Sequence, residues 1–329
     1  MTPKVSVIIP LYNKGNCVER TLRSILKQTY QDFEIIVVDD GSTDNGPEIV
    51  KKFIDPRINL IQQDNRGPGA ARNIGLTHTK GEYVVFLDAD DEWLPEFLQR
   101  GLDFLTNNKG VATISSGYYD TGIDNYELNK IWDRKNVKNG IYELSKNTQS
   151  EIAIWLIAYM IPCTTFAKKN IIKKYGGFFD KNRCLYGEDA HLWLKILLNE
   201  KIGISREKLV IIHRDDSSLS SNLQGVHPIP PLLIYNDSID VFCPIEKKNL
   251  LKNILAIYAS RESKYYAIFG QKIEAASLLK KFCSVNKPRE YYNAKFVIYF
   301  SFIIPYMRPI WRKLRNFSGT WLDFLKIYS

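Results

Sequence analysis

The sequence contains few of the residues that form zinc sites or disulfide frameworks. Its 329 residues include five cysteines and four histidines, with no CxxC pair and no cluster of histidine and cysteine. The cysteines are widely separated: Cys17, Cys163, Cys184, Cys243 and Cys283. This spacing argues against a structural zinc site and against a disulfide-bonded scaffold. Since no secretory signal is present at the N-terminus either, the expected location is cytoplasmic.

Two further features are missing. No segment approaches the roughly 20 apolar residues that a helix needs to span a bilayer. The longest apolar runs, 152–161 and 296–304, are about half that length. The phosphate-binding pattern GxxxxGK[ST] is also absent, which excludes a P-loop nucleotide site.

Acidic side chains are scarce in the last quarter of the chain. Residues 246–329 hold 16 basic and 5 acidic side chains, whereas residues 1–245 hold 29 basic and 31 acidic ones. The last quarter therefore accounts for the whole net charge of +9 and predicts an anionic partner. No recognised nucleic-acid-binding module accompanies this charge, which favours an anionic membrane surface and argues against nucleic acid.

The first part of the chain alternates apolar runs with amphipathic segments. The apolar runs are 4–10, 34–38, 58–62, 83–87 and 111–115, and the amphipathic segments are 16–26, 47–54, 68–79 and 95–105. The former predict strands and the latter helices, with Asn16 as the N-cap of the first helix. The alternation predicts an α/β fold, with a Rossmann-like, mostly parallel sheet that carries helices on both faces.

Acidic residues follow two of the predicted strands. Asp39 and Asp40 end one apolar run, and Asp88, Asp90 and Asp91 end another. Ligands of parallel sheets bind beyond the carboxyl ends of the strands. We therefore expect these carboxylates to lie in the binding crevice.

The sequence Leu87-Asp88-Ala89-Asp90-Asp91 is the strongest indication of a metal site. Two carboxylates one residue apart at a strand end can converge on Mg²⁺ or Mn²⁺. These cations bind few protein carboxylates together with substrate phosphates. By itself the same pattern is also typical of a solvated acidic turn or a helix N-cap.

Residues 37–44, VVDDGSTD, place a carboxylate where it can accept a hydrogen bond from N3–H of uracil. Gly41 permits a sharp turn of the backbone at this point. A turn closed by Asx and Ser/Thr hydrogen bonds, with no ligand, is the alternative that the same composition favours.

Residues 65–73, NRGPGAARN, combine glycines, a helix start at Pro68 and two arginines. The arrangement suits a diphosphate, because glycines allow close approach of the backbone and Arg66 and Arg72 can pair with phosphate oxygens. The alternative is a surface loop with a solvated helix face. It fits Arg66 better than Arg72, which lies three residues into an apolar helix.

Glu188 and Asp189 begin a predicted amphipathic helix in the segment YGEDAHLWL, 186–194. Acidic residues stabilise the first turn of a helix through its dipole, so this pair alone does not indicate chemistry. The four motifs become specific when they are taken together and in this order.

Together the motifs resemble the inverting family-2 glycosyltransferases with a GT-A fold. The matching segments are VSVIIPLYN, the residues Glu19, Arg20, Ser24 and Gln28, then VVDDGSTD, NRGPGAARN, GEYVVFLDADD and GGFFD…GEDAHLWLK. The resemblance covers about the first two hundred residues and fades after about Ser221.

The resemblance implies roles for individual residues. Asp39 or Asp40, with Asp40 preferred, contacts uracil; Asp90 ligates Mn²⁺ or Mg²⁺, with Asp88 beside it and near the ribose; and Asp189 is the catalytic base. The implied nucleotide-sugar-binding set is Pro10, Tyr12, Glu19, Asp39, Asp40, Arg66, Arg72, Asp88, Ala89 and Glu188. One departure matters: where family members often carry YRxHxxS, this chain has His213-Arg214-Asp215-Asp216-Ser217-Ser218, so Asp216 takes the place of a histidine ligand.

The implied reaction is metal-dependent transfer of one sugar from a UDP-sugar, with inversion. The acceptor would be a hydroxyl of a glycan or of a polyprenyl-diphosphate-linked sugar, in the synthesis of a bacterial surface polysaccharide. Two alternatives are a sugar-nucleotide pyrophosphorylase, whose glycine-rich GxGxRx₅PK segment is absent, and a non-catalytic nucleotide- or polyanion-binding protein. Processive synthases carry QxxRW and several membrane spans, which this sequence lacks, so transfer of a single sugar is favoured.

We expect a catalytic domain over 1–225, with a nucleotide-binding half, 1–116, and an acceptor-side half, 117–225. Within the latter, 118–147 predicts loops, 163–167 a strand that returns to the sheet, and 188–198 a helix. Residues 226–329 predict a helical, basic C-terminal region. Its stretch 295–315 joins an aromatic, apolar run to Arg308, Arg312, Lys313 and Arg315 and suits a segment at the inner face of the cell membrane. Helices packed on the catalytic domain, with solvated basic side chains, are the alternative.

Overall fold

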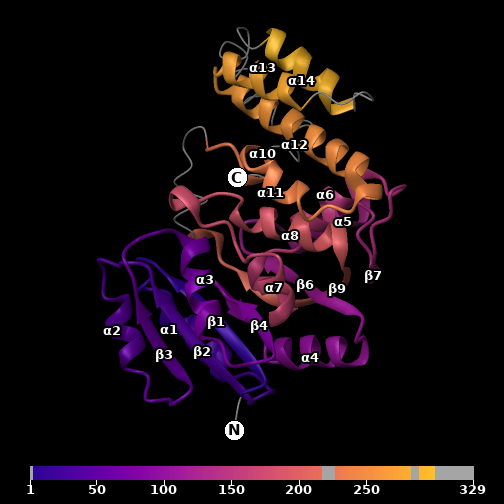
Figure 1. The fold of residues 1–329 in the computed structure, drawn as a ribbon. Coiled ribbons are helices and arrows are strands. Elements are labelled where there is room, and N and C mark those ends of the chain that lie inside the picture. The colour runs from indigo at the N-terminus through magenta and orange to yellow at the C-terminus, as the bar shows by residue number, and fades with distance from the viewer. Residues whose placement is uncertain (1–2, 217–226, 283–288, 301–329) are drawn as a thin grey trace. The chain divides into compact units, whose positions relative to one another are not determined.

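The computed structural model describes residues 3–216, 227–282 and 289–300 (Figure 1). The chain divides into two compact units. The first comprises Met1–Ser217 and Pro230–Lys247, and the second Ser218–Ile229 and Lys248–Ser329. The boundary therefore differs from the one expected at residue 225. Residues 230–247 belong to the first unit, where Ser238 Oγ lies 2.8 Å from His191 Nε2 and the Tyr235 ring packs on Phe179.

The first unit is built on a mixed sheet of nine strands among its described residues. The strands are β1 (Val5–Leu11), β2 (Phe33–Asp39), β3 (Ile58–Gln62), β4 (Tyr83–Phe86), β5 (Glu92–Trp93), β6 (Val111–Asp120), β7 (Gly140–Tyr142), β8 (Thr165–Lys168) and β9 (Lys201–Ile212). Their order is β3-β2-β1-β4-β8-β6-β9-β5, and β7 pairs with β9. Strands β1, β2, β3, β4, β6 and β9 run in one direction and β5, β7 and β8 in the other, which confirms a mostly parallel α/β sheet.

Helices cover both faces of this sheet (Figure 1). They are α1 (Val18–Leu26), α2 (Gly46–Lys51), α3 (Pro68–His78), α4 (Phe97–Asn107), α5 (Asn125–Arg134), α6 (Ser150–Tyr159), α7 (Lys169–Lys174), α8 (Glu188–Asn199), α10 (Pro231–Ile234) and α11 (Asn236–Asp240). Successive side chains of a strand point to opposite faces. Accordingly, in β1, Ile8 packs against Gly75 of α3, whereas Leu11 packs against Gly46 of α2.

Several sequence-based expectations need correction. The N-cap of α1 is Cys17 rather than Asn16, and its side chain makes no capping hydrogen bond. Residues 118–147 are not loops throughout, since β6 continues to Asp120 and α5 and β7 follow. Strand β9 was not predicted, whereas the predicted return strand is confirmed as β8, antiparallel to both β4 and β6.

The register of the parallel strands brings the acidic motifs to one edge. Leu11 at the end of β1 pairs with Asp39, and Asp39 pairs with Gln62 at the end of β3. Ile8 pairs with Phe86, so the residues after β4 leave the sheet beside the end of β1. The segment from Asp88 to Asp91 therefore begins at the same carboxyl edge as Asp39, as predicted from the sequence.

The second unit contains α12 (Lys248–Ile268), α13 (Lys272–Lys281) and α14 (Arg289–Phe300). Its apolar core consists of Tyr266, Ala267, Ala275, Leu279, Ala294 and Ile298. The predicted helical character is thus confirmed for 248–268, 272–281 and 289–300, while the predicted membrane segment beyond residue 300 lies outside the described residues. Within the parts of the chain that the structure describes, no helix is both long and apolar enough to cross a membrane.

Candidate active site

Helix α1 holds the acidic turn that follows β4. Thr21 Oγ1 donates to the carbonyl oxygens of Ala89, at 3.0 Å, and of Asp91, at 2.8 Å. Arg20 donates to the carbonyl of Asp90 at 2.5 Å. Further along α1, Gln28 donates to Leu94 O and accepts from Leu98 N. Arg20 and Thr21 thus position the backbone that carries the carboxylates, and Gln28 positions the segment that follows it.

The carboxylates of this turn form an acidic cluster with little exposure. Asp90 is 9% exposed and Asp91 5%, while the side chain of Asp88 is 36% exposed. Burial, followed by the nearby charge of Asp88, raises the pKa of Asp90, although Lys14 opposes this. Burial and the charges of Asp88 and Asp90 also raise the pKa of Asp91. Ionisation of Asp90 and Asp91 is therefore less favourable than that of a carboxyl group in water.

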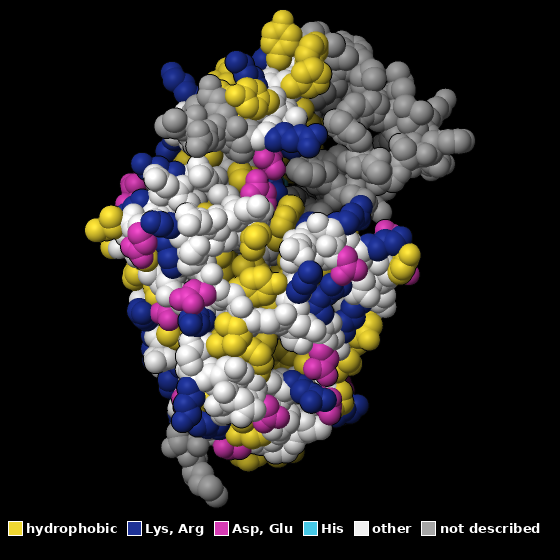
Figure 2. Space-filling model, turned by 90° about the vertical axis from the view of Figure 1, so that its right-hand side faces the viewer, with side chains coloured by type: hydrophobic (Ala, Val, Ile, Leu, Met, Phe, Trp, Pro, Cys, Tyr) yellow, Lys and Arg dark blue, Asp and Glu magenta, His cyan; other side chains and the backbone are white. Residues whose placement is uncertain are grey.

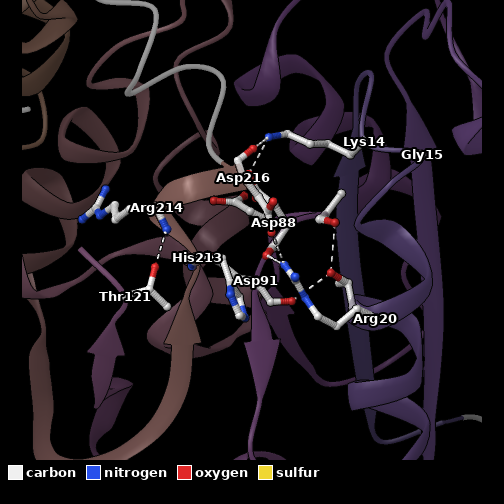
Figure 3. A network of polar contacts seen from close by, with 12 residues as sticks. Lys14, Gly15, Arg20, Asp88, Asp91, Thr121, His213, Arg214 and Asp216 are labelled. Atoms are coloured by element: carbon white, nitrogen blue, oxygen red, sulfur yellow. Dashed lines mark hydrogen bonds and ion pairs between the residues drawn. The ribbon is translucent and has the colours of Figure 1, made fainter. Parts of the chain in front are cut away.

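Lys14, which follows β1, is one of the cations beside this cluster. Its Nζ lies 2.6 Å from Asp90 Oδ2 and also donates to the carbonyl oxygen of Asp216 (Figure 3). Asp216 Oδ2 in turn accepts from Arg20 at 2.9 Å, and this hydrogen bond lowers the pKa of Asp216. The place of the expected histidine ligand is thus filled by an ionised carboxylate tied to the acidic turn. Sequence reasoning missed Lys14, although it directly follows the VSVIIPLYN segment.

His213 takes a structural position at the end of β9. Its backbone nitrogen donates to Asp91 Oδ1 at 3.1 Å, and its Nε2 lies 2.7 Å from Glu92 Oε1 (Figure 3). Arg20 Nε lies 3.3 Å from the same Glu92 oxygen. These contacts attach the segment after β9 to the acidic turn.

A buried guanidinium links the acidic turn to the start of α8. Arg72 of α3, whose side chain is 4% exposed, donates to Asp88 Oδ1 at 2.6 Å and to Glu188 Oε1 at 2.8 Å. Burial alone would lower the pKa of Arg72, but the charges of Asp88 and Glu188 outweigh burial and raise it. Arg72 therefore remains charged. Both of its charged partners are protein carboxylates, so it positions two site motifs relative to each other.

The glycines around α3 make this link possible. Gly67 has φ +91°, and a Cβ there would lie 2.9 Å from the carbonyl oxygen of Cys184. A Cβ at Gly69 would lie 2.2 Å from the carbonyl oxygen of Phe179. Both contacts are closer than a side chain allows. The NRGPG segment therefore lets the start of α3 lie directly against the loop that leads into α8.

Asp189, the predicted base, occupies the first turn of α8. Its Oδ1 accepts from the backbone nitrogen of Ala190 at 2.8 Å, and its neighbour Glu188 is the residue paired with Arg72. Burial, followed by the charge of Glu188, raises the pKa of Asp189 to about 7. A carboxyl group with such a pKa can accept a proton near neutral pH.

Asp39 and Asp40 are both buried, and each accepts hydrogen bonds from backbone nitrogens: Asp39 from its own loop and Asp40 from the loop that follows β3. Asp39 accepts from Ser42 N at 2.9 Å and from Gln62 Nε2 at 3.1 Å. Asp40 accepts from Gln63 Nε2 and from the backbone nitrogens of Arg66 and Gly67, all between 2.7 and 2.8 Å. One oxygen of Asp40 has a single partner, Gly67 N, and so retains capacity for a further donor.

The other predicted donor-binding residues are not all brought together. Tyr12, at the end of β1, is 40% exposed, and Pro10 lies in β1 opposite Val38. The Arg66 side chain is exposed, and its backbone nitrogen binds Asp40. Glu19 instead points away from this set, since it pairs with Arg23 at 2.7 Å on the exposed side of α1. There it lines a hollow of about 470 Å³ with Arg20, Lys27, Trp93 and neighbouring residues.

The acidic turn suits a divalent cation of the Mg²⁺ or Mn²⁺ type. Such cations are held by one or two protein carboxylates together with water and substrate phosphates. Asp88 and Asp90 offer carboxylate oxygens, and burial together with the charge of Asp88 raises the pKa of Asp90, an effect that a bound cation would oppose. Within the described ranges, no group of three or more His, Cys, Asp or Glu side chains is arranged to hold a metal.

The fold is similar to those of two solved glycosyltransferases. Staphylococcus aureus TarS 1–349 in complex with UDP-GlcNAc matches with a TM-score of 0.55 and 20% identity, over 85% of this chain and 90% of that one. The mannosyltransferase PcManGT from Pyrobaculum calidifontis, in complex with GDP-Man and Mn²⁺, matches with a TM-score of 0.54 and 17% identity, over 93% and 87% of the two chains. These likenesses confirm the predicted GT-A type fold.

Curated relatives include GlyG of Streptococcus pneumoniae, which is 30% identical over 224 residues, 67% of this chain and 73% of GlyG. GlyA of the same strain is 32% identical over 225 residues, 64% of this chain and 30% of GlyA. An uncharacterised glycosyltransferase of Rickettsia bellii is 40% identical over 254 residues, 75% of this chain and 35% of that protein. The chain thus spans about a third of the length of the last two. The model of glycosyl transferase family 2 matches residues 6–176, and this chain belongs to that family.

Proposed function

We propose that the chain is a metal-dependent, inverting glycosyltransferase that moves one sugar from a UDP-sugar to an acceptor hydroxyl. The observation that carries this proposal is the position of Arg72, which binds Asp88 of the acidic turn and Glu188 beside the predicted base. The groups expected to hold the donor and to activate the acceptor therefore lie at one edge of the sheet. The family membership and the complexes of TarS with UDP-GlcNAc and of PcManGT with GDP-Man support a nucleotide-sugar donor.

The nucleotide is assigned to the loops after β1 and β2. Asp40, or its neighbour Asp39, accepts from uracil N3–H, and the exposed ring of Tyr12 lies at the same edge, where it can contact the base. Arg66, with an exposed side chain, is placed to reach phosphate oxygens. Arg72 is assigned a positioning role instead, because both of its charged partners belong to the protein.

Asp90 is assigned as the ligand of Mn²⁺ or Mg²⁺, with Asp88 as a second oxygen donor. Bound there, the cation supplies positive charge opposite the negative charge that builds on the departing diphosphate. Thr21 and Arg20 fix the backbone carbonyls of the turn, so that both carboxylates are held in place before the substrate binds.

Asp189 is assigned as the general base. It removes the proton of the acceptor hydroxyl while that oxygen forms a bond to the anomeric carbon and the bond from that carbon to the phosphate oxygen breaks. UDP leaves with the electron pair of the broken bond, and the proton remains on Asp189. Attack from the face opposite the diphosphate inverts the configuration, so an α-linked donor yields a β-linked product.

The acceptor is assigned to the glycan or polyprenyl-diphosphate-linked class, in the synthesis of a bacterial surface polysaccharide. We place the protein in the cytoplasm and at the inner face of the cell membrane. The basic C-terminal quarter supports an anionic membrane partner and no nucleic acid, since no nucleic-acid-binding module accompanies its charge.

The proposal is tested by measuring UDP released from a panel of UDP-sugars, with Mn²⁺ and with excess EDTA. We expect release with at least one donor in the presence of Mn²⁺. The variant Asp189→Asn removes the proton acceptor and keeps the shape, so turnover should fall about 10²- to 10⁴-fold while UDP binding persists. Asp103→Asn, an exposed carboxylate on α4, is the matched control. Full turnover in EDTA, or by Asp189→Asn, would contradict the assignments.

A further inference from the structure

The second unit exposes large apolar side chains on one face of α14. Tyr292 is 59% exposed, Phe296 63% and Tyr299 68%. Their spacing of four and three residues places them on one side of the helix. Ala294 and Ile298 lie on the opposite side and are buried in the core of the unit. These three rings therefore do not contribute to the core that holds α14 in place.

The exposed rings are accompanied by positive charge. Lys295 lies three residues after Tyr292 and four before Tyr299, hence on their side of α14, and the acidic residue of this helix, Glu290, lies in its first turn, away from the rings. Helices α13 and α14 together carry five basic and two acidic side chains: Lys272, Lys280, Lys281, Arg289 and Lys295 against Glu274 and Glu290. Figure 2 shows exposed hydrophobic side chains beside Lys and Arg on the C-terminal unit, at the top of the view.

From these observations we propose that the aromatic face of α14, formed by Tyr292, Phe296 and Tyr299, docks on the surface of an anionic lipid bilayer. Exposed apolar patches of this kind mark surfaces that bind a partner. Amphipathic aromatic rings favour the membrane–water interface, and an amphipathic helix with basic residues lies in the plane of an anionic membrane. Ile273 of α13, 82% exposed and next to Lys272, gives the same unit a further apolar contact.

The charge of the unit favours a bilayer over a second copy of the chain. In a two-fold symmetric dimer the same patch meets itself, so Lys295 and its basic neighbours would face identical charges. The chain from residue 246 onward carries 16 basic and 5 acidic side chains, which makes such self-pairing repulsive and attraction to acidic headgroups favourable. The inference does not depend on the proposed transferase reaction.

The test is co-sedimentation of the full chain with vesicles of phosphatidylcholine alone and with vesicles that contain equal parts of phosphatidylglycerol. We expect the wild-type protein to pellet with the anionic vesicles at low salt and to bind less to neutral vesicles. Binding should also weaken at 0.5 M salt, where the Debye screening length is about 4 Å. The variant Y292S/F296S/Y299S should bind at least about tenfold more weakly, because the three exposed rings that would bury apolar surface in the bilayer are removed.

A matched control removes three exposed apolar side chains from the first unit. Ile54, Tyr126 and Ile141 are 102%, 65% and 49% exposed, so I54S/Y126S/I141S should bind vesicles like the wild type. Circular dichroism establishes that each variant is folded. If Y292S/F296S/Y299S does not fold, K280E/K295E serves in its place, and it should weaken binding to anionic vesicles but not to neutral ones.

Three outcomes overturn the proposal. The wild-type protein remains in the supernatant with anionic vesicles at low salt, or the folded α14 variant binds as tightly as the wild type. In the third, light scattering shows a dimer in the absence of lipid that the α14 substitutions dissociate, which assigns the face to a second copy.

Discussion

Substitution of Arg72 by Met tests whether one buried cation holds the two catalytic motifs together. The Arg72 guanidinium lies over the ring of Phe178, at 5.1 Å from its centroid. Methionine keeps much of the length of the arginine side chain and can still pack against this ring. The substitution removes the charge that faces Asp88 and Glu188. It therefore leaves two carboxylates at the carboxyl edge of the sheet without their cation.

The expected magnitude follows from the exposure of each partner. The side chains of Arg72 and Glu188 are 4% and 10% exposed, so loss of their pair belongs to the buried class, at about 3–5 kcal/mol. Asp88 is 36% exposed and water can solvate it, so its pair adds less than about 1 kcal/mol. For a unit of about 150–250 residues, each kcal/mol lowers the melting temperature by about 2–4 °C. We expect Arg72→Met to lower it by about 6–24 °C.

The assay is thermal unfolding followed by circular dichroism, with Arg66→Met as the matched control. Arg66 lies six residues earlier with an exposed side chain, so its substitution should change stability by about 0.5 kcal/mol or less. The double variant Arg72→Met/Glu188→Gln removes the buried negative charge as well, and should recover part of the lost stability. Arg72→Lys keeps the charge but cannot bind both carboxylates with a planar fork, so it should be intermediate.

The reasoning would be refuted if Arg72→Met melted within about 1 °C of the wild type. A second refutation is a double variant that is less stable than Arg72→Met alone. Either result would mean that the motifs are positioned by other contacts. UDP release should also fall in Arg72→Met, since Glu188 and Asp189 share the first turn of α8.

Three further predictions follow from the same site. Turnover should rise with pH towards a plateau above about pH 7, since Asp189 must be deprotonated to act and its pKa is raised to about 7. Glu188→Gln should shift the midpoint of the profile to lower pH, because the charge of Glu188 contributes to the raised pKa of Asp189. A profile flat from pH 5 to 8 would contradict this assignment. Asp90→Asn should remove Mn²⁺ binding in the presence of UDP, measured calorimetrically, while the protein stays folded, and unchanged Mn²⁺ affinity would exclude Asp90 as a ligand. Asp40→Asn should weaken UDP more than GDP, and tighter binding of GDP than UDP by the wild-type protein would contradict the uracil assignment.

The edge of the sheet where the carboxylates gather could be predicted because it depends on local signals. Short β-branched runs identify strands, and acidic residues directly after them must lie at the carboxyl ends. The pairing of Leu11 with Asp39 and of Ile8 with Phe86 confirms this expectation. The strand β9 escaped prediction because its apolar ends are separated by the polar residues Ser205-Arg206-Glu207-Lys208.

The partners within the site could not be predicted because they are distant in sequence. Arg72 and Glu188 are separated by 116 residues, and Lys14 and Asp216 by 202. Composition favoured diphosphate binding for Arg72, since an arginine near a glycine-rich helix start suits phosphate as well as it suits a carboxylate. The deciding fact is its burial between two acidic side chains, which only the packing of α3 against α8 produces.

The same packing gives a physical account of the departure at residue 216. A neutral histidine beside the acidic turn would leave Arg20 with one fewer carboxylate, whereas Asp216 accepts from Arg20 and its carbonyl accepts from Lys14. Lys14 and Arg20 therefore bind Asp216 as well as the acidic residues Asp90 and Glu92. At this position the chain therefore carries a carboxylate paired with Arg20 in place of the imidazole that the family resemblance implies.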